Sequence, residues 1–377
     1  MNSKICEMLG IEFPLLAFSH CRDVVAAVSK AGGMGVFGAV MYTPEQLREE
    51  LAWIDAHCNG KPYGLDLIVP NKILAEAAAG LDEAALLAAL PQEQLDFVAA
   101  RLQEAGIEPG DLRDQARIAM AFAHNLNASG AEEMLEVAFS FPIKLVANAL
   151  GAPPPAMFDF ARTHDVPVAA LVGAKEHALK QLEAGVDILI ASGGEAGGHC
   201  GDVATMVLVP EVVSVAGDTP VLAAGGIVRG DQMAAAMAMG AAGAWCGSVW
   251  LTTAEAEPSP TIKHKLLAAG SRDTVRSRSR TGKFSRHLRS PWVDAWEAEC
   301  APEPLPLPLQ SLVTEPALAH IAKLAEGGHA GAASLATYWV GQGVGLMTEP
   351  LAAGEVVQHF KRDFITAYER LTAFIGA

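Results

Sequence analysis

Residues 186–201 read Val-Asp-Ile-Leu-Ile-Ala-Ser-Gly-Gly-Glu-Ala-Gly-Gly-His-Cys-Gly. The first six residues, Val186–Ala191, form an apolar run that is typical of a buried strand. Five glycines and a single imidazole, that of His199, follow this run, and glycine lets a ligand come close to the backbone. We therefore expect a strand that ends at a ligand site containing one acid/base group.

Two more glycine-marked segments follow in the sequence. Ala223-Ala224-Gly225-Gly226 comes about a helix and a strand later, and Gly247-Ser248 comes after that. Neither segment contains a titratable ring. Three glycine-marked strand ends in succession, with one histidine among them, indicate a phosphorylated cofactor beside a single acid/base group.

Apolar runs alternate with helical patterns along the chain, which predicts repeated βα units and a parallel α/β sheet. The expected strands are Phe13–Ser19, Gly33–Gly38, Tyr63–Val69, Ile143–Leu150, Val168–Val172, Val186–Ala191, Pro220–Ala224 and Ala244–Leu251. Eight strands close a (β/α)₈ (TIM) barrel, with ligands at their carboxyl ends. A doubly wound open sheet is the alternative, but it needs a glycine-rich phosphate loop after its first strand, and residues 19–23 (Ser-His-Cys-Arg-Asp) provide none. The barrel is favoured.

Three segments depart from the βα repeat. Residues 71–140 are rich in Ala, Leu and Glu and predict a helical insertion after the third strand of a barrel formed by residues 1–255. The insertion is either a cap over the active face or a helical addition without a catalytic part. Residues 256–340 are expected to form a small, mostly helical substrate or cap domain. Residues 341–377 end in a helix, about Gly354–Phe374, whose apolar stripe is expected to pack back on the barrel.

Composition limits the classes of function. The formal net charge of −16 argues against nucleic-acid binding and against docking on anionic membranes. No apolar run reaches the length that spans a membrane, and the first residues lack the apolar stretch of a signal peptide. Six scattered cysteines without a C-x-x-C pair fit a cytoplasmic protein with reduced thiols. Because His20-Cys21 and His199-Cys200 are neighbours whose side chains would point to opposite faces of a strand, we expect no metal site.

Several residue types at these strand ends suit catalysis. A histidine with a pKa near neutrality can remove a proton from carbon, so His199 is the candidate general base, with a structural histidine as the alternative. Gly225-Gly226 and Gly247-Ser248 either bind a phosphate or only make tight turns. Glu195 either orients the loop or is a solvated carboxylate. An arginine-rich stretch either docks a nucleotide-bearing substrate or forms a solvated face paired with acidic neighbours: Arg272, Arg276, Arg278, Arg280, Lys283, Arg286 and Arg289.

The segment Glu195–Gly201 closely resembles the signature of the nitronate monooxygenase (2-nitropropane dioxygenase) family of FMN-dependent TIM-barrel oxidoreductases. Other matching segments occur in the family's order: Ala31–Gly35, Ala223–Ile227, Gly240–Ala241 leading to Gly247-Ser248, and Gly341–Gly343. The resemblance covers most of residues 10–255 and resumes near residue 340.

This resemblance implies that His199 is the catalytic base and that FMN is the cofactor. The implied cofactor-binding residues are Ala17, Phe18, Ser19, Asp66, Gly197, Gly198, Gly225, Gly226, Gly247, Ser248 and Gln342. In this family a nitronate is oxidised with O₂ to a carbonyl compound and nitrite. The implied partners are thus a small-molecule substrate and O₂, and a homodimer is consistent with this class.

The chain departs from the family pattern where the substrate would bind. Phe18 stands where relatives carry methionine, Asp66 where they often carry asparagine, and the fifth strand lacks the lysine of some nitronate oxidisers. His20 and Cys21 could supply a second acid/base group. The alternative is therefore an NAD(P)H-dependent FMN reductase acting on an acyl-CoA or acyl-carrier thioester. A third interpretation is a barrel that binds phosphate ligands without redox chemistry.

Overall fold

The computed structural model describes residues 1–377 except 2, 70–82, 118–127, 149–150 and 376–377. Eight parallel strands form a closed barrel, so the prediction of a (β/α)₈ barrel is confirmed and the open sheet is excluded. The barrel strands are β1 (Leu15–Ser19), β2 (Met34–Gly38), β3 (Tyr63–Leu67), β4 (Val146–Asn148), β5 (Val168–Val172), β6 (Ile188–Ser192), β8 (Val221–Ala224) and β9 (Gly243–Cys246).

Side chains fill the barrel from inside and cover it from outside. Alternate residues such as Leu16, Ile190 and Leu222 form one buried cluster inside the barrel, and the short helix α1 (Lys4–Leu9) adds Ile5 to that cluster. The intervening residues face the surrounding helices. Strands buried on both faces need nearly continuous apolar sequence, which explains why periodicity located them.

The outer layer consists of helices that follow the strands in chain order. They are α2 (Arg22–Lys30), α3 (Pro44–His57), α9 (Ala128–Phe139), α10 (Pro155–His164), α11 (Lys175–Ala184), α12 (Thr205–Ala216) and α13 (Gly230–Ala238). The last barrel strand is shorter than predicted. It ends at Cys246, and the chain then forms the 3₁₀ helix η2 (Ser248–Thr252). There the indole N–H of Trp250 donates to the carbonyl of Cys246 at 2.7 Å.

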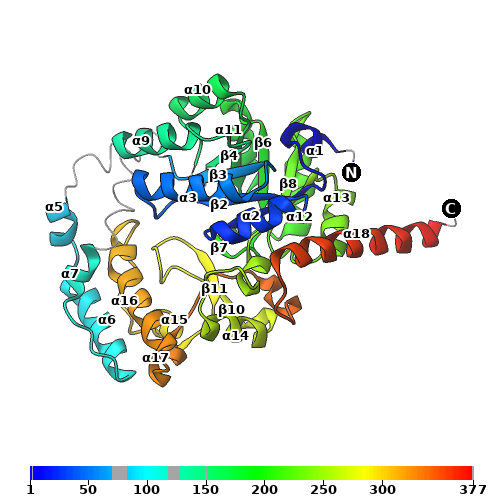
Figure 1. The fold of residues 1–377 in the computed structure, drawn as a ribbon. Helices are drawn as coiled ribbons and strands as arrows, with labels where there is room; N and C mark the ends of the chain where they lie inside the picture. The colour runs from blue at the N-terminus through cyan, green and yellow to red at the C-terminus, as the bar shows by residue number, and fades with distance from the viewer. Residues whose placement is uncertain (2, 70–82, 118–127, 149–150, 376–377) are drawn as a thin grey trace.

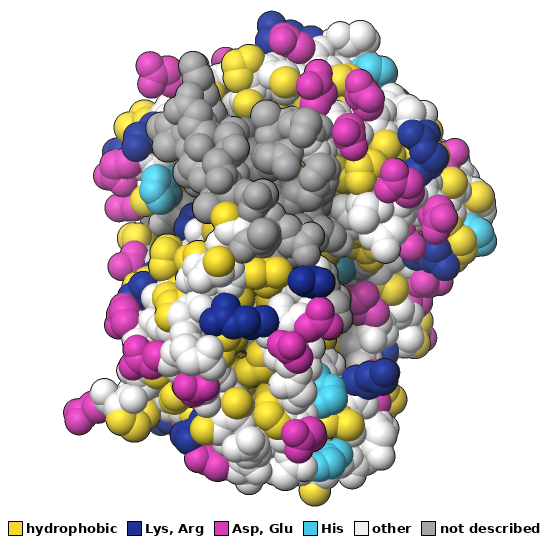
Figure 2. Space-filling view, turned by 90° about the vertical axis from the view of Figure 1, so that its left-hand side faces the viewer, with side chains coloured by type: hydrophobic (Ala, Val, Ile, Leu, Met, Phe, Trp, Pro, Cys, Tyr) yellow, Lys and Arg dark blue, Asp and Glu magenta, His cyan; other side chains and the backbone are white. Residues whose placement is uncertain are grey.

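A second group of elements lies beside the barrel (Figure 1). Its C-terminal part comprises α14 (Pro260–Ala268), η3 (Ser271–Asp273), β10 (Thr274–Ser277), β11 (Ser285–Leu288), α15 (Pro291–Trp296), α16 (Leu309–Glu326) and α17 (Ala330–Leu335). The group also includes α5 (Glu83–Ala88), α6 (Gln92–Glu104) and α7 (Leu112–Ala116), which follow β3 in the chain, and α6 and α7 pack on α16. The face on this side of the molecule carries Asp and Glu side chains interspersed with Lys and Arg (Figure 2).

A small sheet that periodicity did not predict joins this group to the barrel. It has the order β10-β11-β7, where β7 is the two-residue strand Gly198–His199 of the loop after β6. The 256–340 segment was expected to be mostly helical, and it supplies two of the three strands. These strands read Thr-Val-Arg-Ser and Ser-Arg-His-Leu, which lack the apolar runs of the barrel strands.

The chain ends with η4 (Gln342–Leu346) and the long helix α18 (Ala353–Ile375), which packs on α13 and α2. The stripe expected to pack on the barrel divides in two. Val357 and Phe360 are buried, whereas Tyr368 and Leu371 are exposed. The close approach to α13 depends on Gly230, because a Cβ there would lie 2.0 Å from the carbonyl oxygen of Phe360.

We expect Phe360→Ala to lower the free energy of unfolding by about 3–5 kcal/mol, because it leaves a cavity between α18 and the barrel. Urea denaturation followed by circular dichroism measures this change. The matched control is Phe284→Ala. Because Phe284 is about half exposed, this substitution should lower the free energy of unfolding by less than about 1 kcal/mol. Equal losses in the two variants would contradict the assigned packing of α18.

Candidate active site

The loop that carries His199 is held by the β7–β11 pairing. The register places His199 opposite Ser285 and Gly198 opposite Arg286. His199 lies in the loop after the sixth strand, because β6 ends at Ser192 and the loop then turns to pair with β11. Arg286 adds a further tie, since its Nε donates to the carbonyl of Gly194 at 3.0 Å.

Glu195 orients this loop. One carboxylate oxygen accepts hydrogen bonds from both the backbone N–H and the hydroxyl of Thr205, each at 2.8 Å, at the first residue of α12. A carboxylate at a helix N-terminus is stabilised by the free N–H groups and the helix dipole. Of the two interpretations of Glu195, the structure supports the orienting role.

The His199 ring is bonded on one side and open on the other. Its Nε2 lies 2.8 Å from the hydroxyl oxygen of Thr281, and its ring centroid lies 5.9 Å from that of Trp339. Desolvation lowers the pKa of His199 to about 4, and the charges of Lys283 and Arg280 act in the same direction. All three effects disfavour the protonated ring, so the pKa lies below the near-neutral value expected from the sequence. His199 is therefore neutral at pH 7.

Sequence reasoning named Arg280 but missed Thr281 and Trp339, which also lie beside this ring. Arg280 is buried, with its guanidinium carbon 3.9 Å from the Trp339 ring centroid, and it pairs with Glu315 of α16 through two hydrogen bonds of 2.9 and 2.6 Å. Trp339 also contacts His287, at 5.8 Å between ring centroids. The arginine-rich stretch drew attention to Arg280 in the sequence. No sequence feature near Thr281 or Trp339 marked these two residues as neighbours of His199.

His287 is fully buried, and within the described part of the chain neither of its ring nitrogens has a hydrogen-bond partner. Desolvation lowers the pKa of His287 to about 3, and Arg280 and Arg286 act in the same direction. A buried histidine of this kind stays neutral, because charging it would place a cation beside two arginines in a dry environment.

Three segments predicted to bind the cofactor meet at the end of the barrel. The backbone N–H of Gly341 donates to the hydroxyl of Ser248, and that of Gln342 donates to the carbonyl of Glu195, both at 2.8 Å. A Cβ on Gly197 would lie 2.7 Å from the Gly341 nitrogen, so this contact requires glycine. The signature loop, η2 and the 341–343 segment are thus in direct contact.

Residues 225–226 and 247–248, which we call the glycine cradle, present hydrogen-bond donors. Gly225 and Gly226 have φ angles of +106° and +69°, which favour glycine. Among the described residues, no acceptor lies in hydrogen-bond range of the backbone N–H of Gly226 or of Gly247. Because Ser248 accepts from Gly341, its own O–H is left to donate. Free amides and a hydroxyl on adjacent strand ends form an anion site suited to phosphate.

The first strand contributes differently from its neighbours. Ala17 packs in the cluster outside the barrel, so among the predicted cofactor contacts it offers only its backbone, and the Ser19 hydroxyl accepts from the N–H of Cys21 at 3.1 Å. Phe18 faces the barrel interior, where its ring stacks on Trp245 with 6.1 Å between centroids.

Asp66 and His20 lie near Gly38 at this end of the barrel. His20 Nδ1 is 2.7 Å from the Gly38 carbonyl oxygen, and Gly38 is the register partner of Asp66. Asp66 is buried, and its Oδ1 has no hydrogen-bond partner among the described residues. Desolvation raises the pKa of Asp66 well above its usual value, which favours the neutral acid over the carboxylate.

The arginine-rich stretch is mostly engaged within the protein. Arg278 pairs with Glu303, Arg280 with Glu315 and Arg289 with Asp294. Arg276 lies over the Phe284 ring at 4.2 Å. This pattern agrees with the interpretation of pairing with acidic neighbours, although Arg280 is buried rather than solvated.

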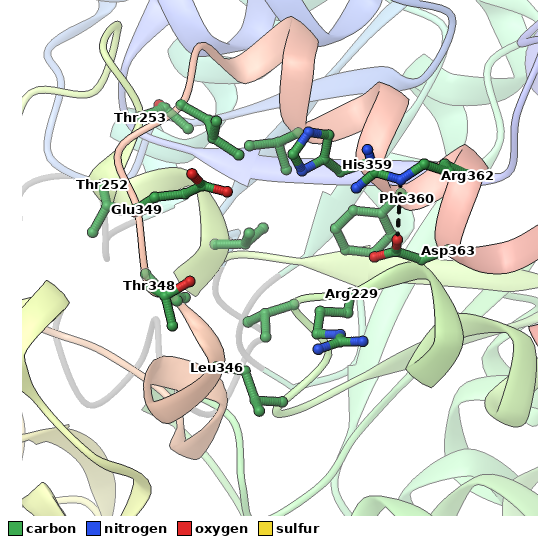
Figure 3. A pocket seen from close by; sticks show the side chains of 15 residues that line it. Arg229, Thr252, Thr253, Leu346, Thr348, Glu349, His359, Phe360, Arg362 and Asp363 are labelled. Carbon is green, nitrogen blue, oxygen red and sulfur yellow. Dashed lines mark ion pairs between the residues drawn. The ribbon is translucent and has the colours of Figure 1, made fainter. Parts of the chain in front are cut away.

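A cavity of about 260 Å³ lies elsewhere, between η2, residues 346–351 and the first half of α18 (Figure 3). Arg229, His359 and the Arg362–Asp363 ion pair line it, together with apolar side chains. None of the predicted catalytic or cofactor-binding residues is among the lining residues. Within the described ranges we find no cluster suited to a metal ion and no helix able to span a membrane.

We expect acid to destabilise the fold through His287. Its pKa is about 3 in the folded protein and near 6.5 when unfolded, so between these values the unfolded chain binds more protons and stability rises with pH. The slope from one such group approaches about 1.4 kcal/mol per pH unit. His287→Phe should lower the slope by about that amount in urea titrations between about pH 3.5 and 6.5, with His199 contributing to the slope that remains. The control His57→Phe, at an exposed histidine of α3, should leave the slope unchanged. An unchanged slope in His287→Phe would contradict the buried, unpaired state.

Comparisons with known proteins show the family of the chain. The family model described as nitronate monooxygenase matches residues 3–363. A protein of Mycobacterium tuberculosis that carries the name of a monooxygenase is 49% identical over 100% of both chains. A hydroxy-methyl-oxo-octahydroindene-carboxyl-CoA dehydrogenase of Rhodococcus jostii is 38% identical over 45% of this chain and 48% of its own. The solved structure of nitroalkane oxidase from Streptomyces ansochromogenes has a TM-score of 0.78 at 24% identity, covering 97% of this chain and 99% of that one. The chain is an oxidoreductase that belongs to the nitronate monooxygenase family.

Proposed function

We propose that this protein is an FMN-dependent nitronate monooxygenase that oxidises alkyl nitronates or nitroalkanes with O₂. The observation that carries the proposal is a neutral imidazole, His199, on a loop whose backbone contacts the segments beside a phosphate-type cradle. The free amides of Gly226 and Gly247 and the hydroxyl of Ser248 would hold the FMN phosphate. When bound, FMN would take up electrons from the substrate and deliver them to O₂.

His199 is the group that would handle the substrate proton. The Thr281 hydroxyl lies 3.4 Å from the carbonyl oxygen of Lys283, to which it can donate. In that arrangement Thr281 accepts from His199 Nε2–H, which leaves Nδ1 with the lone pair. A neutral Nδ1 can remove the proton from the carbon next to a nitro group. The positive charges of Lys283 and Arg280 would then favour the anionic nitronate over the neutral nitroalkane.

The second candidate is an FMN-dependent reductase or related flavoenzyme that acts on an acyl-CoA or acyl-carrier thioester with NAD(P)H. The CoA-ester name of the Rhodococcus relative favours it. Arg276 and Arg286 also favour it, because both lie beside the His199 loop and bond its backbone carbonyls, at Cys200 and Gly194. Arginines at this position suit the phosphates of a nucleotide-bearing carrier.

Anaerobic reduction distinguishes the two candidates. We expect that mixing the FMN-loaded protein with a nitronate bleaches the flavin absorbance, and that NADPH does not. Admission of O₂ should then restore the absorbance and release nitrite. Bleaching by NADPH alone would refute the nitronate proposal and support the reductase. If the protein binds phosphate but takes up no flavin, the result would refute both flavoenzyme candidates and support the third interpretation, a phosphate-binding barrel without redox chemistry.

Substitutions at His199 and Thr281 test the proton-handling role. His199→Ala should retain bound FMN and lose turnover of the neutral nitroalkane by roughly 10²–10⁴-fold, because the base is gone while the glycine cradle is intact. Thr281→Val should lose part of this rate and shift its pH profile, and Thr281→Ser should recover it. Full nitroalkane turnover in flavin-loaded His199→Ala would rule out His199 as the base.

A further inference from the structure

The C-terminal half of α18 carries large apolar side chains that no part of the described structure covers. We call the set Ile365, Tyr368, Leu371 and Phe374 the overhang. Their exposed fractions are 56%, 64%, 52% and 84%. In Figure 1 the end of α18, in red, runs out from the barrel and stands free of the other elements. Scattered apolar residues are common on protein surfaces, but four on successive turns of one helix form a patch.

The overhang continues a stripe that is used for packing inside the same chain. Phe360 is buried and Phe364 is half-buried against Phe13, at 6.0 Å between ring centroids. Steps of four, four and three residues lead from Phe360 through Phe364 and Tyr368 to Leu371, which is the spacing of one helix face. The face that packs on α13 thus extends beyond the barrel, where nothing in the described chain meets it.

The overhang also lies outside the part of the sequence that the family shares. The family match ends at residue 363, two residues before Ile365. The alignment with the Mycobacterium tuberculosis relative, in contrast, covers the whole chain. The catalytic and cofactor-binding candidates all precede residue 343 in the sequence. The exposed apolar side chains of the overhang therefore need an explanation other than catalysis.

Its area fits an interface with a second copy. An aromatic side chain can bury roughly 150–250 Å², so at these exposures the four side chains present on the order of 500 Å² per chain. Two copies would remove on the order of 1,000 Å² from water, which is near the lower limit for a specific interface. An isolated helical segment of this length is marginal in water, and packing against a partner would stabilise it.

The charges beside the overhang favour self-association over a strongly charged partner. Glu369 and Arg370, both exposed, follow Tyr368, so one acid and one base flank the stripe. Two such helices related by a twofold axis can place the Arg370 of each chain near the Glu369 of the other. The patch is thus locally neutral in a chain of net charge −16, which lowers the repulsion between copies at this point.

We propose that the overhang is a homodimer interface, in which the C-terminal halves of two α18 helices pack together about a twofold axis. The partner is a second copy of this chain, and the apolar contacts come from Ile365, Tyr368, Leu371 and Phe374. This proposal does not depend on the substrate or the cofactor of the enzyme.

Sedimentation velocity and light scattering over a range of protein concentrations test the proposal on the full chain. We expect a dimer for the natural sequence. The double variant Tyr368→Glu/Leu371→Glu should raise the dimer dissociation constant on the order of 100-fold or more, because it places four charges in the apolar contact. Tyr368→Ala/Leu371→Ala provides a second, milder variant, and the thermal midpoint and circular dichroism of each monomer show whether it is folded.

The matched control is Thr366→Glu/Ala373→Glu. These two exposed residues lie on the opposite face of the same helix and add the same charge. The control should remain dimeric. A natural chain that is monomeric at all concentrations would overturn the proposal, as would a dimer that persists in folded Tyr368→Glu/Leu371→Glu. Equal dissociation in the stripe variant and the control would also overturn it, because the effect would then be one of charge alone.

Discussion

The short antiparallel pairing between β7 and β11 determines where His199 lies. It ties the glycine-rich loop after β6 to a strand from a distant part of the sequence, with His199 opposite Ser285. The same loop is fixed at its start by Glu195 and along its length by contact with residues 341–343. A loop of five glycines would otherwise have large conformational freedom. The pairing and the two further contacts convert that freedom into a single position for the imidazole.

The electrostatics of this position follow from the residues behind it. Arg280 is buried but paired with Glu315, and its guanidinium lies on Trp339. Desolvation is the main reason that both His199 and His287 stay neutral, and this buried cation adds to it by raising the cost of a second positive charge nearby. The charges of Lys283 and Arg280 would also favour an anion at the His199 ring, as the proposed function requires. The arrangement therefore suits a base that works as a neutral imidazole and a product that is negatively charged.

The parts of the fold that the sequence predicted are those set by local rules. Helix α3 begins at Pro44 for local reasons, because Thr43 and Gln46 form a capping box and Pro44 stands in the first turn. Strand β5 also has its predicted limits, since its apolar run is bounded sharply. The glycine cradle could be predicted because glycine at consecutive strand ends has a geometric cause.

The remaining features depend on contacts between distant residues. Strands β10 and β11 show neither an apolar run nor an alternation of polar and apolar residues, and their pairing with each other and with β7 makes them a sheet. Thr281 became a partner of His199 through that sheet, and no local signal marks it among the other threonines. The apolar stripe of α18 was visible in the sequence, but periodicity cannot show where the surface that it packs on ends. In this chain the barrel ends first, so the stripe divides into a buried half and an exposed half. The two halves of α18 therefore have separate roles. The first half stabilises the fold by packing on the barrel helices, and the second half can contact another molecule without any change at the active site.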